Sequence, residues 1–203
     1  MKIIGTWSSP FVRKVRIAAM ERQIACEFAV DAPLSEQTKV PLSNPLGRVP
    51  VLVLDDGTAL IDSPLICAHL EELSAPGPSL FPADRGQRSA LLQWQAVADG
   101  IADAAVLARM EVIRPEALRS ASWIERQKGK ISRALGWMEE RLDGRPFCIG
   151  EAFSLADIAM GCSVSYLRFR FAEDASEGQF PNVGRVCEQI ERRESFRATQ
   201  LRA

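Results

Sequence analysis

The chain has almost no net charge and no long hydrophobic run. Its 203 residues carry 26 acidic and 25 basic side chains, which gives a formal net charge of −1. A charge this close to zero provides no global positive field to hold nucleic acid or an anionic membrane surface. The longest uncharged apolar stretch of the C-terminal half, residues 158–167, has ten residues, whereas a membrane-spanning helix needs about 20. We therefore expect no nucleic-acid partner and no membrane partner.

Cysteine and histidine are too few and too scattered for a disulfide framework or a metal centre. The five cysteines are odd in number and contain no CxxC pair, which disfavours both disulfide pairing and zinc binding. The single histidine, His69, argues against a histidine-rich metal site and against a Ser-His-Asp triad. We expect no metal and no covalently bound cofactor. The cysteine usage and the absence of a signal-peptide pattern predict a cytoplasmic location.

The first 75 residues alternate between short apolar runs and amphipathic helical patterns. Ser9-Pro10 is a typical helix start, and Asp56-Gly57 is a strong hairpin turn. Strands are predicted over residues 2–7, 25–29, 49–54 and 58–61, and helices over residues 11–22 and from residue 62 to about residue 73. This order, βαβ followed by ββα, predicts a thioredoxin-like domain with strands 1 and 2 parallel and strands 3 and 4 antiparallel.

The remainder of the chain has no convincing strand pattern. Residues 74–86 contain three prolines and two glycines, which is typical of a linker. Helical spacing of apolar residues then predicts four helices, over residues 88–113, 115–142, 154–171 and 182–193. We therefore expect an α+β protein in which residues 1–75 form the thioredoxin-like domain, 76–86 the linker and 87–203 an all-α helical domain.

Four motifs, in order along the chain, resemble those of the cytosolic glutathione transferase superfamily, and the first looks most like its bacterial serine-type members. They are SSPFVRKVR at residues 8–16, NPLGRVPVL at residues 44–52, Asp62-Ser63, and FSLAD at residues 153–157. The resemblance covers nearly the whole chain. It implies the glutathione transferase fold, glutathione as co-substrate and a homodimer. It also implies detoxification chemistry, in which glutathione is conjugated to a small hydrophobic electrophile or used to reduce peroxides.

Ser9 is the expected catalytic residue. A thiol has a pKa near 8.5, so only a small fraction is thiolate at neutral pH. A hydroxyl that donates to the sulfur at the positive end of a helix favours the charged form and needs no histidine partner. The alternative is that Ser9 only caps the helix. Ser8, one residue earlier, is the alternative donor to the sulfur.

The resemblance implies the remaining contacts with glutathione. Val49-Pro50 is expected to be a cis peptide that leaves the backbone of Val49 free to pair with an extended ligand. Asp62 and Ser63 start a helix, where the serine and its amide would hold the γ-glutamyl carboxylate and the aspartate the ammonium; the alternative for both is helix capping. Arg48 is expected to bind the glycyl carboxylate, with Lys39 as the alternative.

The electrophile is expected to lie against Trp7 and Phe11 and against the helix that contains Arg109 and Met110. Ser154 and Asp157 have the spacing of a capping box, so we expect a structural role for them.

Two other functions compete with the transferase. A non-catalytic regulatory or protein-interaction module is disfavoured by the joint presence of Ser9, Val49-Pro50 and Asp62-Ser63. A thiol–disulfide reductase would place cysteine where this chain has serine.

Overall fold

The chain divides into two compact units, which we describe separately. The computed structural model describes residues 1–75, 77–171 and 178–202. One unit consists of Met1–Phe81 together with Arg193–Ala203, and the other of Pro82–Arg192. Pro76 in the expected linker, and residues 172–177 and 203 of the expected helical domain, lie outside the described residues.

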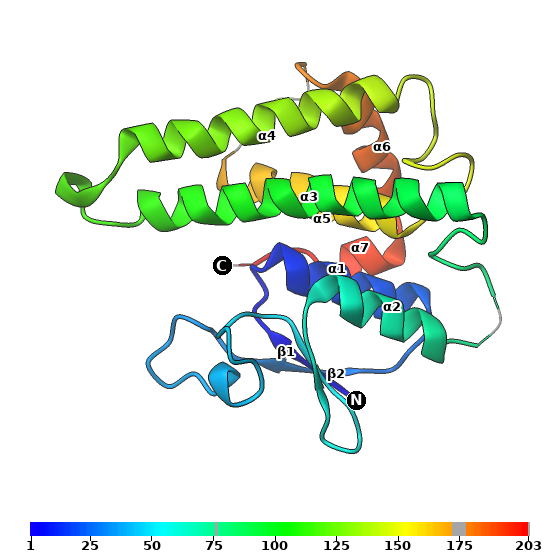
Figure 1. Ribbon diagram of the computed structural model, residues 1–203, viewed down its shortest axis with the longest axis horizontal. Helices are drawn as coiled ribbons and strands as arrows, with labels where there is room; N and C mark the ends of the chain where they lie inside the picture. The colour runs from blue at the N-terminus through cyan, green and yellow to red at the C-terminus, as the bar shows by residue number, and fades with distance from the viewer. Residues whose placement is uncertain (76, 172–177, 203) are drawn as a thin grey trace. The chain divides into compact units, whose positions relative to one another are not determined.

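The first unit is built on a four-stranded mixed sheet, as the thioredoxin-like pattern predicted. The strands are β1 (Lys2–Gly5), β2 (Glu27–Val30), β3 (Val51–Val53) and β4 (Ala59–Leu60), in the order β2-β1-β3-β4. β1 is parallel to β2 and antiparallel to β3, and β3 is antiparallel to β4, which confirms the expected pairings. The short helix η1 (Val40–Leu42) lies between β2 and β3. Helices α1 (Pro10–Glu21) and α2 (Ser63–Leu73) cover one face of the sheet (Figure 1).

The core of this unit lies between the sheet and the two helices. Ile3 and Leu52 on the sheet, Val15 and Ile17 on α1, and Ile66 on α2 are almost completely buried. Burial of each such side chain contributes about 1.5–3 kcal/mol to folding. The core therefore fixes the two helix N-termini relative to the ends of the strands.

The last segment of the chain belongs to the first unit, which corrects the expected boundary of an all-helical domain over residues 87–203. Helix α7 (Glu194–Ala198) packs on α1. Arg13 of α1 donates a hydrogen bond to the carbonyl of Phe196 at 3.2 Å. At the other end of α1, Glu21 accepts two hydrogen bonds from Arg193, at 2.8 and 2.6 Å. These contacts span more than 170 residues of sequence, so local patterns did not reveal them.

Replacing Glu21 with glutamine is expected to destabilise the first unit by about 1 kcal/mol at neutral pH, because it removes a half-exposed ion pair with Arg193. Burial raises the pKa of Glu21, but hydrogen bonds from Arg193 and Ser195 outweigh it and lower the pKa overall. A lowered carboxyl pKa stabilises the fold above the unfolded-state value, about 4.3, and this contribution disappears as the pH falls through the folded-state pKa. Urea denaturation between pH 7 and pH 3 would measure it. The same pH dependence in Glu21→Gln and in the unchanged protein would contradict the assignment.

The second unit contains helices α3 (Arg85–Val112), α4 (Ala121–Arg141), α5 (Leu155–Arg170) and α6 (Pro181–Glu191), with a short helix η2 (Glu116–Leu118) between α3 and α4. α3 packs against both α4 and α5 (Figure 1). The first turn of α3 is capped by Asp84, whose carboxylate accepts a hydrogen bond from the backbone N–H of Gln87 at 2.9 Å. Because α3 starts at Arg85, it begins inside the linker expected over residues 76–86. The expected helix over residues 115–142 starts later, because Ser120 caps α4.

Asp157, buried in the first turn of α5, forms the predicted capping box with Ser154. Its carboxylate accepts the backbone N–H of Ser154 and that of Cys148, at 2.9 and 2.8 Å, and the Ser154 hydroxyl at 2.9 Å. Burial raises the pKa of this carboxyl, although the hydrogen bonds from Cys148 and Ser154 act in the opposite direction. The side chain thus joins the loop before α5 to the start of that helix.

We expect Asp157→Ala to destabilise the second unit by about 2–5 kcal/mol, because it leaves two buried N–H groups, of Cys148 and Ser154, without an acceptor. Asp157→Asn keeps one carbonyl acceptor and should lose less. Thermal melting and titration with glutathione separate the two possible roles of Asp157. Weaker binding at an unchanged melting temperature would contradict a structural role.

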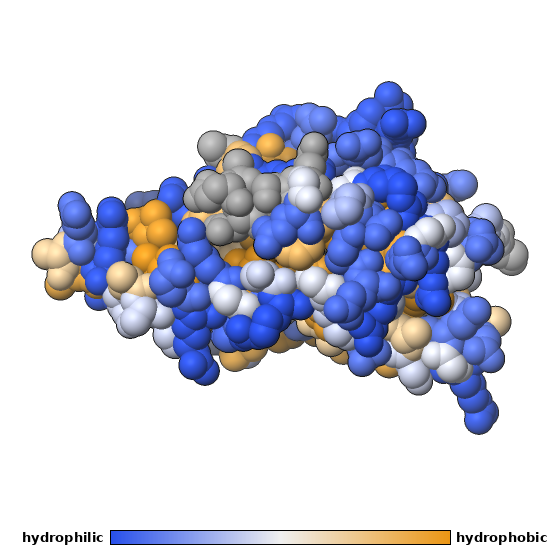
Figure 2. All heavy atoms as spheres, turned by 90° about the horizontal axis from the view of Figure 1, so that it is seen from above, coloured by the Kyte–Doolittle hydropathy of each residue, from blue (hydrophilic) through white to orange (hydrophobic). Residues whose placement is uncertain are grey.

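The surface of the second unit is mostly hydrophilic over α4, as Figure 2 shows from above. Apolar side chains gather at the end that carries the α3–α4 connection, where Ile113 is 50% and Leu118 is 58% exposed. None of the helices in the described ranges is both long and apolar enough to cross a membrane. All five cysteines are free thiols, and no group of potential metal ligands occurs among the residues placed by the structure.

Candidate active site

The strand register brings three of the four sequence motifs to one end of the sheet in the first unit. Val51 of β3 pairs with Ile4 of β1, next to the point where the chain leaves β1 for Ser9. Leu52 pairs with Leu60 of β4 in the antiparallel direction. Continuing that register places Pro50 opposite Asp62. The start of α1, the Val49-Pro50 bend and the start of α2 therefore adjoin one another.

Ser9 is the N-cap of α1, and its side chain is half-buried. Its Oγ accepts a hydrogen bond from the backbone N–H of Val12 at 3.3 Å. This contact uses a lone pair of the oxygen and leaves the hydroxyl proton available for another acceptor. The capping role expected as the alternative is thus present, and it is compatible with donation to a sulfur. Ser8 lies in the preceding turn and is also half-buried.

The Val49-Pro50 peptide is cis, as predicted. No hydrogen bond joins the N–H or the C=O of Val49 to another residue that the structure places. The loop before it is held by Asn44, a buried residue whose amide donates to the Arg48 carbonyl at 2.7 Å and whose Oδ1 accepts from the Leu46 amide at 2.9 Å. Asn44 had no expected role, although asparagine before proline is a typical turn signal.

Asp62 is the N-cap of α2, and Ser63 is its first residue. The Ile61–Asp62 peptide is also cis. Asp62 is exposed and accepts the Ser63 N–H on its Oδ1 at 2.5 Å. The amide expected to hold a ligand carboxylate is therefore already bonded to a carboxylate of the chain itself, so Asp62 has to rotate away before a ligand can take its place.

The Ser63 hydroxyl is fully buried and has no hydrogen-bond partner. A buried hydroxyl without a partner costs about 1–3 kcal/mol, so such atoms are rare unless a ligand or a water satisfies them. Ser63 directly follows Asp62, which the register described above places opposite Pro50, next to Val49. The residues present therefore fit a ligand that carries a carboxylate and a peptide backbone.

Two basic residues were expected to compete for the second carboxylate of such a ligand. Arg48 and Lys39 are both exposed. The backbone of Arg48 is tied to Asn44, whereas the backbone N–H of Lys39 donates to Asp31 at 3.0 Å. Arg48 is adjacent to the cis peptide bond, which favours it over Lys39.

Trp7, expected to contact the electrophile, lies in a cluster of aromatic and basic side chains. Its ring contacts Phe28 edge-on, with centroids 4.5 Å apart. The guanidinium groups of Arg16 and Arg202 lie 4.5 and 5.1 Å from the Trp7 ring centroid. Burial, together with the charges of Arg202 and Arg13, lowers the pKa of Arg16. The surroundings of Trp7 are therefore positively charged, which favours a nearby anion.

The four residues expected to line an electrophile pocket are divided between the two units. Trp7 and Phe11 flank the start of α1, and the Lys14 ammonium lies 6.0 Å from the Phe11 ring centroid. Arg109 and Met110 are half-buried near the end of α3. A pocket formed by all four residues stays a prediction.

Comparison with protein families gives two matches along the chain. The glutathione S-transferase N-terminal domain matches residues 4–79. The glutathione S-transferase C-terminal domain matches residues 121–189. The first match contains Ser9, Val49-Pro50 and Asp62-Ser63, and the second contains the capping box at Ser154.

Three individual proteins match this chain over nearly its whole length. An uncharacterized GST-like protein of Escherichia coli, YibF, is 36% identical over 201 residues, which are 98% of each chain. A crystal structure of a glutathione S-transferase from Methylobacillus flagellatus with bound glutathione has a TM-score of 0.95 and 38% identity over 99% of each chain. A glutathione S-transferase from Methylobacterium radiotolerans, in complex with glutathione sulfonate, has a TM-score of 0.95 and 37% identity, and the match covers 100% of the present chain and 95% of the other.

Proposed function

The chain belongs to the glutathione S-transferase family, and on that premise we propose that it binds glutathione in the first unit and transfers the glutathione thiolate to small apolar electrophiles. The observation that carries the proposal is the buried, unpartnered Ser63 hydroxyl at the same end of the sheet as Ser9 and the free backbone of Val49. Glutathione carries a carboxylate and a peptide backbone, which can form hydrogen bonds with the Ser63 hydroxyl and with the backbone of Val49.

In this proposal each part of glutathione has its own contact. The γ-glutamyl carboxylate accepts from the Ser63 hydroxyl and, after Asp62 rotates, from the Ser63 amide. The released Asp62 carboxylate then pairs with the γ-glutamyl ammonium, and the cysteinyl backbone pairs with Val49 in the manner of an added strand. The sulfur is thereby directed to the start of α1, where Ser9 has a hydroxyl proton to donate.

The chemistry follows from the position of the sulfur. The Ser9 hydroxyl, the N-terminus of α1 and the positive surroundings of Trp7 all favour the thiolate over the thiol. The thiolate attacks an electrophilic carbon, a C–S bond forms, and the displaced group leaves with its bonding electrons. Attack on a peroxide oxygen is the alternative reaction of the same thiolate. The homodimer and the cytoplasmic location stay predictions.

Retention on immobilised glutathione tests the proposal most cheaply. We expect the protein to bind glutathione-agarose, to be eluted by free glutathione, and to conjugate glutathione to an activated chloroarene. Retention without conjugation would favour the non-catalytic module. Failure to bind would contradict the proposed site.

Arg48→Gln is expected to weaken glutathione binding several-fold, whereas Lys39→Gln, the matched control, should leave it nearly unchanged. The effect is modest because exposed ion pairs contribute only about 0.2–1 kcal/mol, which corresponds to at most about a fivefold change in affinity. Calorimetric titration with glutathione and with γ-glutamylcysteine, which lacks the glycyl group, measures the contact directly. The loss in Arg48→Gln should vanish with the shorter ligand. A loss confined to Lys39→Gln would transfer the role to Lys39.

A further inference from the structure

The C-terminal segment of the chain returns to the start of α1, next to Ser9. The backbone N–H of Arg202 donates a hydrogen bond to the Trp7 carbonyl at 3.4 Å, and the Arg202 guanidinium lies 5.1 Å from the Trp7 ring centroid. Figure 1 shows this segment beside the first turn of α1. The Ser9 N–H donates to the Thr6 carbonyl at 3.4 Å, so the turn over residues 6–9 brings Trp7 close to the expected donor to the sulfur.

Two arginines of α1 extend this cluster. Arg13 and Arg16 are three residues apart, so they share one face of the helix. The Arg16 guanidinium lies 4.5 Å from the ring centroid of Trp7 and 4.6 Å from that of Phe28. Arg13 is buried, and its guanidinium donates to the Phe196 carbonyl at 3.2 Å. The first unit therefore gathers three positive charges at this face of α1.

The arginine cluster, which consists of Arg13, Arg16 and Arg202, has no counter-charge among the residues that the structure describes. None of the three forms an ion pair with a carboxylate of the described ranges. The arginines act on one another instead, because burial and then the charges of Arg202 and Arg13 lower the pKa of Arg16. Like charges a few ångströms apart repel by about 1 kcal/mol or more. An anion that binds among them relieves this repulsion, so the cluster favours an anionic ligand.

The arginine cluster and the proposed glutathione contacts lie on opposite sides of β1. The sheet order is β2-β1-β3-β4, so β1 has β2 on one side and β3 on the other. Trp7 contacts Phe28 of β2, whereas Val49 lies just before β3 and Ser63 begins α2. Because Ser9 follows β1, the middle strand of the three, it lies between the two sets of residues. An anion held by the cluster therefore belongs to the second substrate rather than to glutathione.

We propose that Arg16 and Arg202 select electrophiles that carry a carboxylate, an inference that rests on the proposed function and narrows its substrate class. The carboxylate accepts hydrogen bonds from the two guanidinium groups, whose planar donors suit it. The electrophilic carbon, at the apolar end of the substrate, then faces the sulfur at Ser9. Arg13 is a positioning residue, because its donors hold α7 and with it the segment that carries Arg202.

A matched pair of chloroarenes tests this selectivity at saturating glutathione and pH 7. In 4-chloro-3-nitrobenzoate and 4-chloro-3-nitrobenzamide the thiolate attacks the same carbon, a C–S bond forms, and chloride leaves with its bonding electrons. The measured quantity is kcat/KM for the benzoate divided by kcat/KM for the benzamide. Both compounds react with the same thiolate, so a change in the thiolate fraction cancels in this ratio. We expect the unchanged protein to raise the ratio above that of the uncatalysed reactions with glutathione.

Four variants locate the selectivity. Arg202→Gln should lower the ratio about two- to fivefold, because an exposed ion pair with the substrate is lost. Arg16 is half-buried, so Arg16→Gln should lower the ratio about tenfold. Arg202→Lys keeps the charge and should keep most of the preference for the benzoate. Arg197→Gln, the matched control, alters an arginine of α7 that pairs with Glu194 at 2.8 Å, and it should leave the ratio unchanged.

Calorimetric titration should give the same affinity for glutathione in all four variants. If Arg16→Gln does not fold, Arg202→Gln, which alters an exposed side chain, decides the question. A ratio that stays unchanged in these two variants would overturn the inference even if both rates fall, because the arginines would then act on the thiolate alone. Turnover of the benzamide without turnover of the benzoate would overturn the inference and leave the proposed function intact. Turnover of neither compound by the unchanged protein would overturn the proposed function, and the inference with it.

Discussion

Replacing Ser9 with alanine is expected to lower turnover about ten- to hundredfold while changing the affinity for glutathione little. The lost hydrogen bond to the thiolate is worth about 1.5–3 kcal/mol, which raises the pKa of the bound thiol by about one to two units. The thiolate fraction at neutral pH falls by the same factor. The contacts that hold the tripeptide, at Val49 and Ser63, are untouched. Steady-state kinetics with an activated chloroarene and calorimetric titration with glutathione measure the two quantities.

Ser9 also caps α1 through Val12, so a control has to separate the cap from the donor. Glycine is nearly as good an N-cap as serine and costs only a few tenths of a kcal/mol, and Ser9→Gly therefore removes the donor while keeping most of the cap. Ser9→Thr retains both functions and should keep the higher turnover. Full turnover in Ser9→Gly would remove Ser9 from the mechanism, and Ser8→Ala would then test the neighbouring hydroxyl.

Ser63→Ala is expected to have opposite effects on stability and on binding. The hydroxyl is buried without a partner in the absence of ligand, so its removal should stabilise the free protein or leave its stability unchanged. Asp62 remains as the N-cap of α2. The affinity for glutathione should fall about ten- to hundredfold, because a hydrogen bond to the ligand carboxylate is lost.

Urea denaturation of the free protein and titration with glutathione measure both effects of Ser63→Ala. Ser165→Ala is a suitable comparison, because that hydroxyl has a partner, Glu191, at 2.8 Å in the second unit. It should lose some stability and keep its affinity for glutathione. A Ser63→Ala variant that is clearly less stable and binds glutathione normally would show that the hydroxyl has a structural role only.

Local signals in the sequence predict most of the first unit. The Ser9-Pro10 start of α1, the Asp56-Gly57 turn and the Val49-Pro50 bend each have a distinct backbone preference, and all three are present in the structure. The strand ends differ by at most two residues from the predicted ones, since pairing with a neighbouring strand rather than composition decides where a strand ends. The resemblance to a known family supplied the candidate glutathione contacts.

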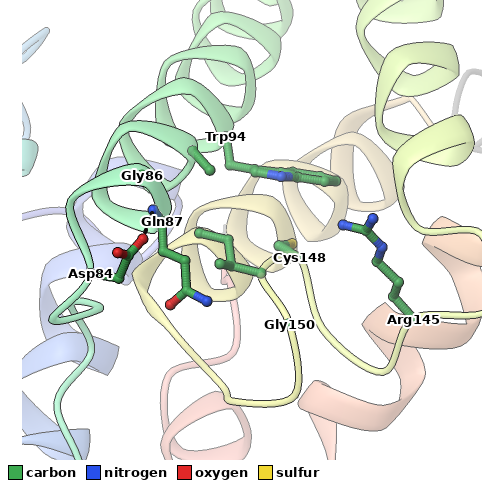
Figure 3. A pocket seen from close by; sticks show the side chains of 9 residues that line it. Asp84, Gly86, Gln87, Trp94, Arg145, Cys148 and Gly150 are labelled. Atoms are coloured by element: carbon green, nitrogen blue, oxygen red, sulfur yellow. Dashed lines mark hydrogen bonds between the residues drawn. The ribbon is translucent and has the colours of Figure 1, made fainter.

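Three features depend on contacts that no local pattern encodes. The docking of Arg193 and α7 on α1 depends on hydrogen bonds from Arg13 and to Glu21 across most of the chain length. The burial of the Ser63 hydroxyl results from packing around α2. A hollow between the first turns of α3 and the loop over residues 145–150, lined in part by Trp94, forms only because that loop packs back against α3 (Figure 3). Each of these features results from contacts between residues that are distant in the sequence.

The most direct test of thiolate stabilisation at this site is the pKa of the glutathione thiol when it is bound to the unchanged protein. Thiolate absorbance in the ultraviolet, followed against pH at saturating protein, gives this value. We predict a thiol pKa about two units below that of free glutathione, which corresponds to about 2.7 kcal/mol of preferential stabilisation of the thiolate. Bound glutathione that titrates at the same pH as the free tripeptide would contradict the proposed function.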